Sequence, residues 1–302
     1  MYDIIIIGGG PAGLTSGIYA RRANKSVLVI EKNSFGGQIT SSPKVENIPG
    51  FSEVTGNEFA EQLVEQAIFQ GVEFEYSEAT EIIDGDIKKV VTDGGTFEAK
   101  AIIIATGTKH RHLGLPNEEK FIGDGISFCA VCDGAFFTGK TVAVIGGGNS
   151  ALQEAIQLSE LAKQVYVVQN LSYLTGEASL AKQVEEKENI TVILNHTVSA
   201  ILGSDTFKGI TINNAEDNTA QELELDGMFV AIGLIPQNEY FKNVITLDSY
   251  GYADYDETLK TETKGIFVAG DSRKKQIRQV VTAASDGAVA ALLACDYINQ
   301  IG

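Results

Sequence analysis

The sequence predicts an α/β protein of two similar three-layer domains, with the second domain inserted into the first. The apolar run 4–7 leads directly into a glycine-rich turn and a helix-like segment at 8–22, and residues 142–161 repeat this order of strand, turn and helix. Such an order is typical of Rossmann-like nucleotide-binding domains. A third related strand returns at 265–271. We therefore expect the first domain to resume after the second one ends.

Chain length and the positions of proline indicate where the domains divide. A chain of 302 residues exceeds the size at which one hydrophobic core usually keeps growing. The similar strands 101–107 and 227–233 each close one unit, and proline-bearing links follow at 114–116 and 234–237. The expected divisions are a first domain at 1–114, an inserted domain at 115–238, and the remainder of the first domain at 239–302.

Charge and hydropathy restrict the partners and the compartment. Lys and Arg number 23 against 40 Asp and Glu, a net charge of −17, which argues against nucleic acid or an anionic membrane as a general partner. No stretch approaches the run of about 18 apolar residues that a membrane helix needs, so none is expected. The first apolar run is too short for a signal peptide and lacks preceding basic residues. We expect a cytoplasmic protein.

The first glycine-rich turn has the pattern of a dinucleotide site. Gly8, Gly10 and Gly13 form GxGxxG, which permits a tight turn and a close approach of the backbone to a pyrophosphate at the positive end of a helix. The next strand, 27–30, ends at Glu31, where a carboxylate can accept from a ribose hydroxyl. The alternative is a glycine-rich loop that binds nothing, and the strand, helix and acid together weaken it.

Two of the three cysteines lie at disulfide-forming spacing and are followed by a carboxylate. Cys129 and Cys132 form a CxxC pair, and Asp133 comes next. Such a pair can close into a disulfide or open to two thiols, and it commonly favours the thiolate. The alternative is half of a zinc site, which needs four ligands. Because the remaining Cys295 and three histidines supply no second close pair, we expect a redox centre and no metal.

Several motifs together resemble the low-molecular-weight thioredoxin reductases, and the resemblance spans the whole chain. They are the two glycine fingerprints, CAVCDG at 129–134, ATG at 105–107, GGQ at 36–38, VENIPG at 45–50, and Gly270-Asp271 with Arg278-Gln279. In that family the first fingerprint binds FAD, and the second domain carries the CxxC and binds NADPH. Electrons pass from NADPH through the flavin to the disulfide and on to thioredoxin. The resemblance also implies a homodimer.

The resemblance assigns roles to individual residues. Cys132 is expected to face the flavin, Cys129 to attack the thioredoxin disulfide, and Asp133 to serve as the acid. Larger disulfide reductases use a C-terminal histidine instead, and the last histidine here is His196. For Gly270-Asp271 an ordinary turn at a strand end is the alternative. The residues expected to bind FAD are Gly8, Gly10, Pro11, Ala12, Gly13, Glu31, Lys32, Gly37, Gln38, Asn47, Ala105, Thr106, Gly107, Gly270, Asp271, Arg278 and Gln279.

The second fingerprint departs from the family. GxGxxA at 146–151 is retained, but Gln169 stands where the first domain has its acid. Family members that use NADPH carry HRRxxxR here, whereas this chain reads QNLSYLT and has no Lys or Arg between Lys163 and Lys182. Losing two charge-assisted contacts costs about 3–6 kcal/mol, or roughly 10²–10⁴ in affinity. NADH is less firmly excluded, because Gln169 could still bond a 2′-hydroxyl.

A chain of this kind without a nicotinamide site must receive electrons elsewhere. It resembles the ferredoxin-dependent flavin thioredoxin reductases, which lack the basic motif. Ferredoxins are acidic, and the basic runs 109–112 and 273–275 with Arg278 could form a docking surface on the edge that carries the cofactor. The alternative is a linker and a solvated loop.

Three other functions stay open from the sequence. The first is an NAD(P)H-dependent thioredoxin reductase. The second is a dithiol oxidase of the same fold that passes electrons from thiols to oxygen. The third is a non-catalytic flavoprotein that uses the CxxC as a redox-sensing switch.

Overall fold

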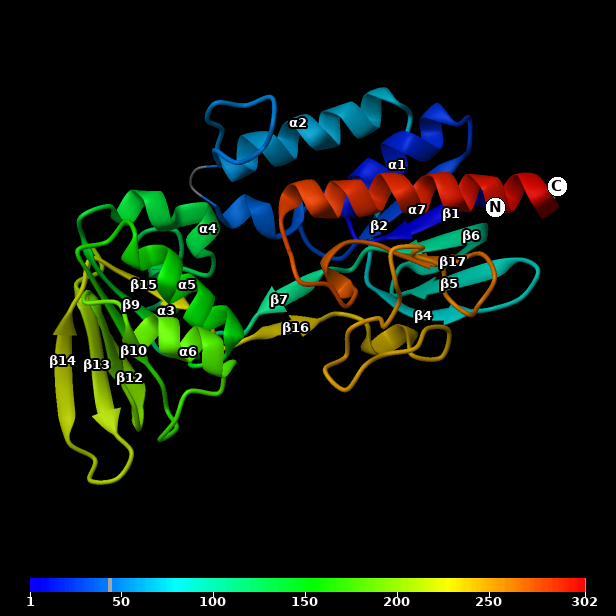
Figure 1. The fold of residues 1–302 in the computed structure, drawn as a ribbon. Helices are drawn as coiled ribbons and strands as arrows, with labels where there is room; N and C mark the ends of the chain where they lie inside the picture. Colours follow the sequence, from blue (N-terminus) through cyan, green and yellow to red (C-terminus); the bar gives the residue numbers. More distant parts are fainter. Residues whose placement is uncertain (43–44, 302) are drawn as a thin grey trace. The chain divides into compact units, whose positions relative to one another are not determined.

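A computed structural model describes residues 1–42 and 45–301, and the chain forms two compact units (Figure 1). Unit 1 comprises Met1–Thr40, Ile48–Lys109 and Ile235–Gly302, and unit 2 comprises Ser41–Asn47 and His110–Leu234. The first main crossing between the units lies a few residues before the link predicted at 114–116, and the second falls within the link predicted at 234–237. They fall within β7 (Thr108–His110) and β16 (Leu234–Pro236), which pair as a two-stranded sheet.

Unit 1 is built on a seven-stranded sheet of order β3-β2-β1-β6-β5-β4, with β17 also paired to β6. On the edge away from β1, the first half of the long β6 pairs antiparallel with β5, and its last three residues pair parallel with β17. The parallel part therefore runs β3-β2-β1-β6-β17, and its carboxyl ends share one edge. The strands are β1 (Tyr2–Ile7), β2 (Val27–Glu31), β3 (Glu73–Tyr76), β4 (Ala79–Ile83), β5 (Lys88–Thr92), β6 (Gly95–Ile104) and β17 (Ile266–Val268).

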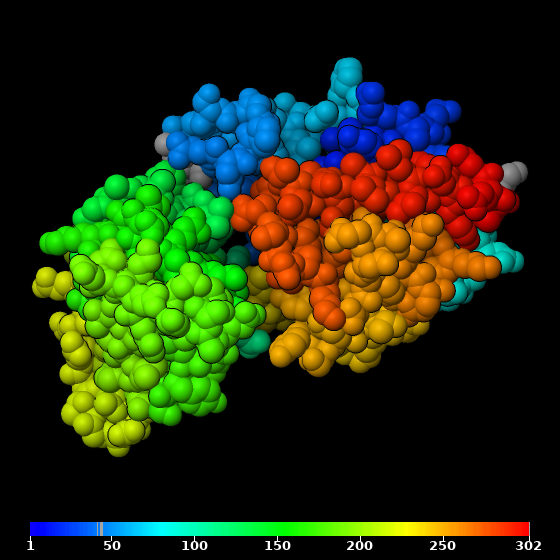
Figure 2. Space-filling model, in the orientation of Figure 1, coloured from blue at the N-terminus to red at the C-terminus, as the bar shows by residue number. Residues whose placement is uncertain are grey.

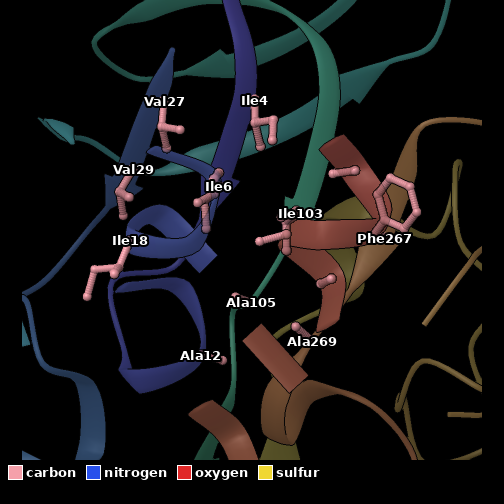
Figure 3. Packing of buried hydrophobic residues seen from close by; sticks show 14 of the residues in the cluster. Ile4, Ile6, Ala12, Ile18, Val27, Val29, Ile103, Ala105, Phe267 and Ala269 are labelled. Carbon is pink, nitrogen blue, oxygen red and sulfur yellow. The ribbon is translucent and has the colours of Figure 1, made fainter. Parts of the chain in front are cut away.

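Both faces of this sheet are covered, because successive strand residues point to opposite sides. Ile4, Ile6 and Ile103 pack in one core with helix residues, as Figure 3 shows, and Ile5 and Ile102 belong to a second core on the other face. The helical segments of unit 1 are α1 (Pro11–Arg22), α2 (Gly56–Phe69), α7 (Val280–Ile301), η1 (Gly37–Ser41), η3 (Glu239–Phe241) and η4 (Gly270–Ser272).

Helix α7 corrects one expectation from the sequence. It is long and apolar enough, by length and composition alone, to cross a membrane. Asp286 and Asp296 interrupt the apolar sequence of this helix, so the sequence contains no unbroken apolar run here. In the structure α7 packs on α1, with Gly287 so close that an added Cβ would lie 2.1 Å from the Ala12 carbonyl oxygen. Figure 2 shows its outer side, in red, on the surface of unit 1. Helices that form part of a core satisfy the same criterion.

Unit 2 has a parallel sheet of order β11-β10-β9-β15-β8 and an antiparallel sheet of order β12-β13-β14. Val142 and Val144 face a core shared with α5, whereas Ala143 and Ile145 face the antiparallel sheet. Its elements are α3 (Glu118–Phe121), β8 (Ile126–Ser127), α4 (Ala130–Asp133), η2 (Gly134–Phe137), β9 (Thr141–Ile145), α5 (Asn149–Ser159), β10 (Gln164–Val168), α6 (Ala178–Glu185), β11 (Ile190–Ile193), β12 (His196–Leu202), β13 (Gly209–Asn214), β14 (Ala220–Glu224) and β15 (Gly227–Val230).

The internal repeat is visible in the strand order. In unit 1 β1 lies between β2 and β6, and in unit 2 β9 lies in the same way between β10 and β15. Each central strand runs through a glycine turn into a helix, and Gly10 and Gly148 are the respective N-cap residues. The predicted fold class, two three-layer nucleotide-binding domains with one inserted into the other, is confirmed.

Candidate active site

The redox centre lies in unit 2 at the start of a very short helix. Cys129 and Cys132 form a disulfide, with their Cα atoms 5.3 Å apart. Cys129 is the N-cap of α4, and its Sγ accepts from the Cys132 amide at 3.2 Å. Val131, between the two cysteines, is 53% exposed. The disulfide is thus held on a segment that presents an apolar side chain to solvent.

The carboxyl of Asp133 follows the disulfide and is buried. Its Oδ2 accepts from Ser127 Oγ at 2.6 Å, and that hydroxyl accepts from the Cys129 amide at 3.1 Å. Burial raises the pKa of Asp133, and the hydrogen bond from Ser127 opposes the rise. Asp133 therefore keeps its proton to a higher pH than an ordinary aspartate, as a proton donor to a nearby thiolate requires.

In unit 1 the glycines of the first turn have separate tasks. Gly8 has φ +111°, and a Cβ there would lie 2.3 Å from the Ala105 carbonyl oxygen. A Cβ on Gly13 would lie 1.9 Å from the Gly8 oxygen, so these two glycines let strand, turn and helix pack together. At Gly10 the nearest atom to an added Cβ is the Gly37 Cα, at 3.8 Å. The turn is therefore open at Gly10.

The start of α1 suits an anion. Among the described residues no side chain caps it, and no acid lies in its first turn. Glu31 lies beside the turn, where its carboxylate accepts from the Gly9 amide at 2.7 Å and from the Asn33 amide at 2.8 Å. It thereby occupies the position predicted for a ribose-binding acid.

The segment after β17 returns to the same turn. Gly270 has φ +77°, and a Cβ there would lie 2.8 Å from the Ala12 Cβ. Asp271 follows in η4, and its buried Oδ1 has no hydrogen-bond partner among the described residues, with the Lys275 ammonium at the longer ion-pair distance of 3.7 Å. Burial raises the pKa of Asp271, against the opposing charges of Lys275 and Arg278. The structure thus brings Gly270-Asp271 to the first fingerprint.

Arg278 carries a second unsatisfied polar atom. Its guanidinium carbon lies 4.4 Å from the centre of the Tyr252 ring, and its buried Nε has no hydrogen-bond partner among the described residues. Buried polar groups are nearly always hydrogen-bonded, so both Arg278 and Asp271 indicate a ligand with polar groups of its own.

The remaining predicted residues of this site vary in their surroundings. Lys32 pairs with Glu78 at 2.9 Å, and Gln38 Nε2 donates to the Thr108 carbonyl. Thr106 Oγ1 donates to Asn238 Oδ1 at 3.1 Å. Gly107 has φ +65° and open space around an added Cβ, and the Gln279 amide donates to Thr282 Oγ1. Asn47 belongs to the segment grouped with unit 2, and its role stays a prediction.

The second turn, in unit 2, keeps the backbone form of the first. Gly146 has φ +129°, and a Cβ there would lie 2.5 Å from the Ala231 oxygen. A Cβ on Gly147 would lie 2.6 Å from the Gln169 amide group, so Gln169 lies beside this turn much as Glu31 lies beside the first. Gln169 Oε1 accepts from the Asn170 amide, and Nε2 lies 3.4 Å from the Tyr173 carbonyl. The Gln169 amide is thus engaged within its own loop.

That loop also folds back onto the start of α5. The Gly147 carbonyl accepts from the amides of Thr175 at 2.8 Å and Gly176 at 2.9 Å. Asn149, the first residue of α5, accepts from the Glu177 amide at 2.7 Å and donates to the Glu177 carboxylate at 3.1 Å. A carboxylate therefore lies near the end of α5 at which a pyrophosphate would bind.

Comparison with known proteins now identifies the family. The model of the family described as pyridine nucleotide-disulphide oxidoreductase matches residues 2–287. The chain belongs to that family. It is 38% identical to the thioredoxin reductase of Bacillus subtilis over 303 residues, which cover 100% of this chain and 96% of that protein. It is 41% identical over 299 residues, 98% of this chain and 97% of the other, to a 34.2 kDa protein in the rubredoxin operon of Clostridium pasteurianum.

A solved structure gives the same result. The thioredoxin reductase from Streptococcus pyogenes superposes with a TM-score of 0.94 at 38% identity and covers 99% of both chains. The present protein is accordingly a flavin-dependent disulfide oxidoreductase of the thioredoxin reductase type, and it binds FAD. The open side of the first turn, the uncapped α1 and the unsatisfied atoms of Asp271 and Arg278 fit that cofactor.

The basic surface expected after Gly270-Asp271 is wrong as stated. Arg273 donates to Asp286 at 2.9 Å and Lys275 to the same carboxylate at 3.1 Å, and both basic side chains are more than nine-tenths buried. Lys274 is exposed but pairs with Asp254 at 3.0 Å. The basic side chains of this run form ion pairs with acids of unit 1. Residue spacing in the sequence does not predict these pairs, because the acids come from other elements.

The run 109–112 is also only partly a charged surface. His110 stacks on Phe128, with 4.7 Å between ring centres, and burial, with a smaller effect of His112, lowers the pKa of His110 to about 4. His112 stacks on the same ring. Lys109 and Arg111 remain exposed.

Sequence reasoning missed several residues of both sites. Asn238 is fully buried and donates to the carbonyls of Gly251 and Ser272, which fixes the loop against Thr106. Ser127 and Asp286 were missed as well. No spacing signals their roles, because each acts through a partner that only the fold brings near.

Proposed function

We propose that this protein reduces the disulfide of thioredoxin with electrons that reach its FAD from reduced ferredoxin. The observation that carries the choice of donor is the charge around the second turn: no Lys or Arg lies between Lys163 and Lys182, and Glu177 lies beside the helix start. The choice of substrate is supported by the Cys129–Cys132 disulfide with a buried acid next to it, and by relatives named thioredoxin reductase.

The chemistry divides between cofactor and chain. FAD, when bound, accepts electrons from a donor and passes a pair to the disulfide. Two electrons and two protons convert the Cys129–Cys132 disulfide into two thiols, and we assign one of those protons to Asp133. The Cys129 thiolate then attacks the thioredoxin disulfide to form a mixed disulfide. The Cys132 thiolate displaces thioredoxin as a dithiol and restores the starting disulfide.

A nicotinamide donor is disfavoured by charge. A 2′-phosphate would meet no arginine or lysine between Lys163 and Lys182, and the pyrophosphate would approach Glu177. Retention of the glycine turn is accounted for by packing, because any side chain at Gly146 would collide with the Ala231 carbonyl.

Docking of an acidic ferredoxin would use the cations that remain exposed. Lys109 lies in β7, which ends at His110, and Arg111 follows that strand. We propose this pair as part of the docking surface. We further propose a homodimer and a cytoplasmic location, which light scattering and cell fractionation would measure.

Anaerobic titration of the purified flavoprotein tests the donor. Reduced ferredoxin should bleach the flavin quickly, whereas millimolar NADPH or NADH should bleach it very slowly. Fast bleaching by micromolar NADPH would establish the nicotinamide-dependent reductase instead. Oxygen consumption with dithiols, in the absence of thioredoxin reduction, would establish the dithiol oxidase. Absence of turnover with every donor would favour the redox sensor.

A further inference from the structure

Ser127 links the backbone of one cysteine to the carboxyl of Asp133. It ends β8 and is only 6% exposed. Its oxygen accepts from the Cys129 amide at 3.1 Å and lies 2.6 Å from Asp133 Oδ2. A hydroxyl has one proton to donate, and here the donor to the hydroxyl is already an amide. The Ser127 proton is therefore directed at Oδ2.

This arrangement distinguishes the two oxygens of the carboxyl. Oδ2 acts as an acceptor, so the proton of the neutral acid belongs on Oδ1. Oδ1 is buried and has no hydrogen-bond partner among the described residues. We propose that Ser127 is a positioning residue that holds the transferable proton of Asp133 on Oδ1, ready for a cysteine thiolate. The proposal rests on the acid role given to Asp133 in the proposed function.

A pocket of about 370 Å³ lies beside this pair, entirely within unit 2. Both Ser127 and Asp133 line it, together with the aromatic rings of Phe136, Phe137 and Phe207. The space permits a methyl group to be added at position 127 while the hydroxyl is kept. Threonine is therefore a suitable conservative replacement, and alanine removes the hydroxyl alone.

Other ionisable groups lie near Asp133, and their titration must be distinguished from that of Asp133 in any pH profile. Lys140, Asp124 and Asp226 line the same pocket. Helix α5, which packs on α4, carries Glu154, and burial raises the pKa of Glu154 to about 8. Glu154→Gln removes that titration and leaves the network of Ser127 unaltered.

The test compares Ser127→Ala, Ser127→Thr and a matched control, Ser159→Ala, in the flavoprotein with Glu154→Gln as background. Ser159 is also a buried serine of unit 2, but its hydroxyl donates to the Ile156 carbonyl. Dithionite supplies the electrons, so the result does not depend on ferredoxin. Infrared spectra record the protonated carboxyl band, which Asp133→Asn identifies by its loss. Stopped-flow assays record thioredoxin reduction against pH.

Ser127→Ala should move the carboxyl band in frequency and displace its titration to higher pH, because the bond from Ser127 favours the carboxylate. Thioredoxin reduction should fall by at least about tenfold, within the usual contribution of a general acid. Ser127→Thr should restore both the frequency of the carboxyl band and the rate of thioredoxin reduction. Ser159→Ala should show the same band and rate as the Glu154→Gln background. Loss of rate with an unchanged band, a normal rate with alanine, or failure of threonine to restore would each overturn the proposal.

The acid role of Asp133 can be disproved independently of the positioning role of Ser127. If Asp133→Asn reduces thioredoxin at the background rate and with the same pH profile, the proposed function of Asp133 is wrong whatever Ser127 does. If Asp133→Asn is impaired and Ser127→Ala is normal, only the positioning role is wrong.

Discussion

Cys129, Cys132 and Cys295 share one side-chain chemistry, and their surroundings give them different roles. The first two are joined on α4 with an exposed residue between them. Cys295 is a free thiol buried on α7, where burial raises its pKa. A buried thiol with a raised pKa is a poor nucleophile and acts as a small apolar residue.

Cys129→Ser and Cys132→Ser should each abolish thioredoxin reduction, because the two sulfurs act as one relay. Both variants should retain FAD, since the residues that fit the cofactor lie in unit 1. Cys295→Ser is the matched control and should turn over normally. Turnover assays with flavin absorbance measure both properties. Near-normal turnover in either single variant would remove this pair from the reaction.

Glu154 should make stability fall as pH rises. Its Oε2 is buried with no hydrogen-bond partner among the described residues, and burial raises its pKa from 4.5 to about 8. The folded state then holds the proton more tightly than the unfolded state. The free energy of unfolding therefore begins to fall at about pH 4.5 and levels off above about pH 8. The total loss is on the order of a few kcal/mol.

Glu154→Gln should therefore raise the unfolding temperature above pH 8 and have little effect below pH 4.5. Thermal unfolding across this range measures the difference. Glu185→Gln is a suitable control, because Glu185 lies on the exposed side of α6. An equal effect of Glu154→Gln at every pH would contradict a buried neutral acid.

At the scale of elements, the two strand-turn-helix units share a backbone form and differ in the side chain beside the turn, which is Glu31 in the first and Gln169 in the second. Gly8 and Gly146 both pack against a carbonyl of a neighbouring strand end. Gly10 and Gly148 both lie at a helix start with φ near −80° and no atom within 3.6 Å of an added Cβ. Alanine is thus tolerated sterically at either position.

Gly10→Ala should fold but lose FAD, because its methyl group would occupy the open side of the turn where the pyrophosphate approaches. Gly148→Ala, in the turn of unit 2, should retain FAD fully. The flavin absorbance per chain of each purified variant, with circular dichroism as the measure of folding, gives the comparison. Equal FAD content in the two variants would contradict the assignment of the first turn.

For the whole molecule, the net charge of −17 repels an acidic partner, so docking of such a partner depends on the few exposed cations at the contact surface. The double variant Lys109→Glu and Arg111→Glu should slow reduction by ferredoxin. The wild-type rate should fall as salt is added, since exposed charge pairs are screened. Stopped-flow measurement of flavin bleaching at several ionic strengths tests both effects.

Lys163→Glu is the matched control, because it changes an exposed lysine elsewhere in unit 2 and should leave the rate unchanged. Dithionite should bleach the double variant normally. Ferredoxin transfer that is indifferent to both salt and the double substitution would exclude this surface as the docking site.

The sequence was sufficient to predict the fold class, both glycine turns and the CxxC pair, and it shows that no Lys or Arg follows the second turn between Lys163 and Lys182. These features are local: residue periodicity and glycine spacing along the chain are enough to specify a strand, a turn and a helix. The position of Glu31 beside the first turn is a local feature of the same kind, because Glu31 follows the next strand of the same unit.

Which basic side chains are exposed, and which acid lies in a hydrogen-bonded network beside the disulfide, depends on the tertiary structure. Arg273 and Lys275 follow a strand end as a basic run, but Asp286 on α7 neutralises both. Ser127 acquires its position because β8 brings it beside Asp133. A side chain's protonation and its exposure depend on burial and on partners from other elements, and no spacing in the sequence records which elements will meet.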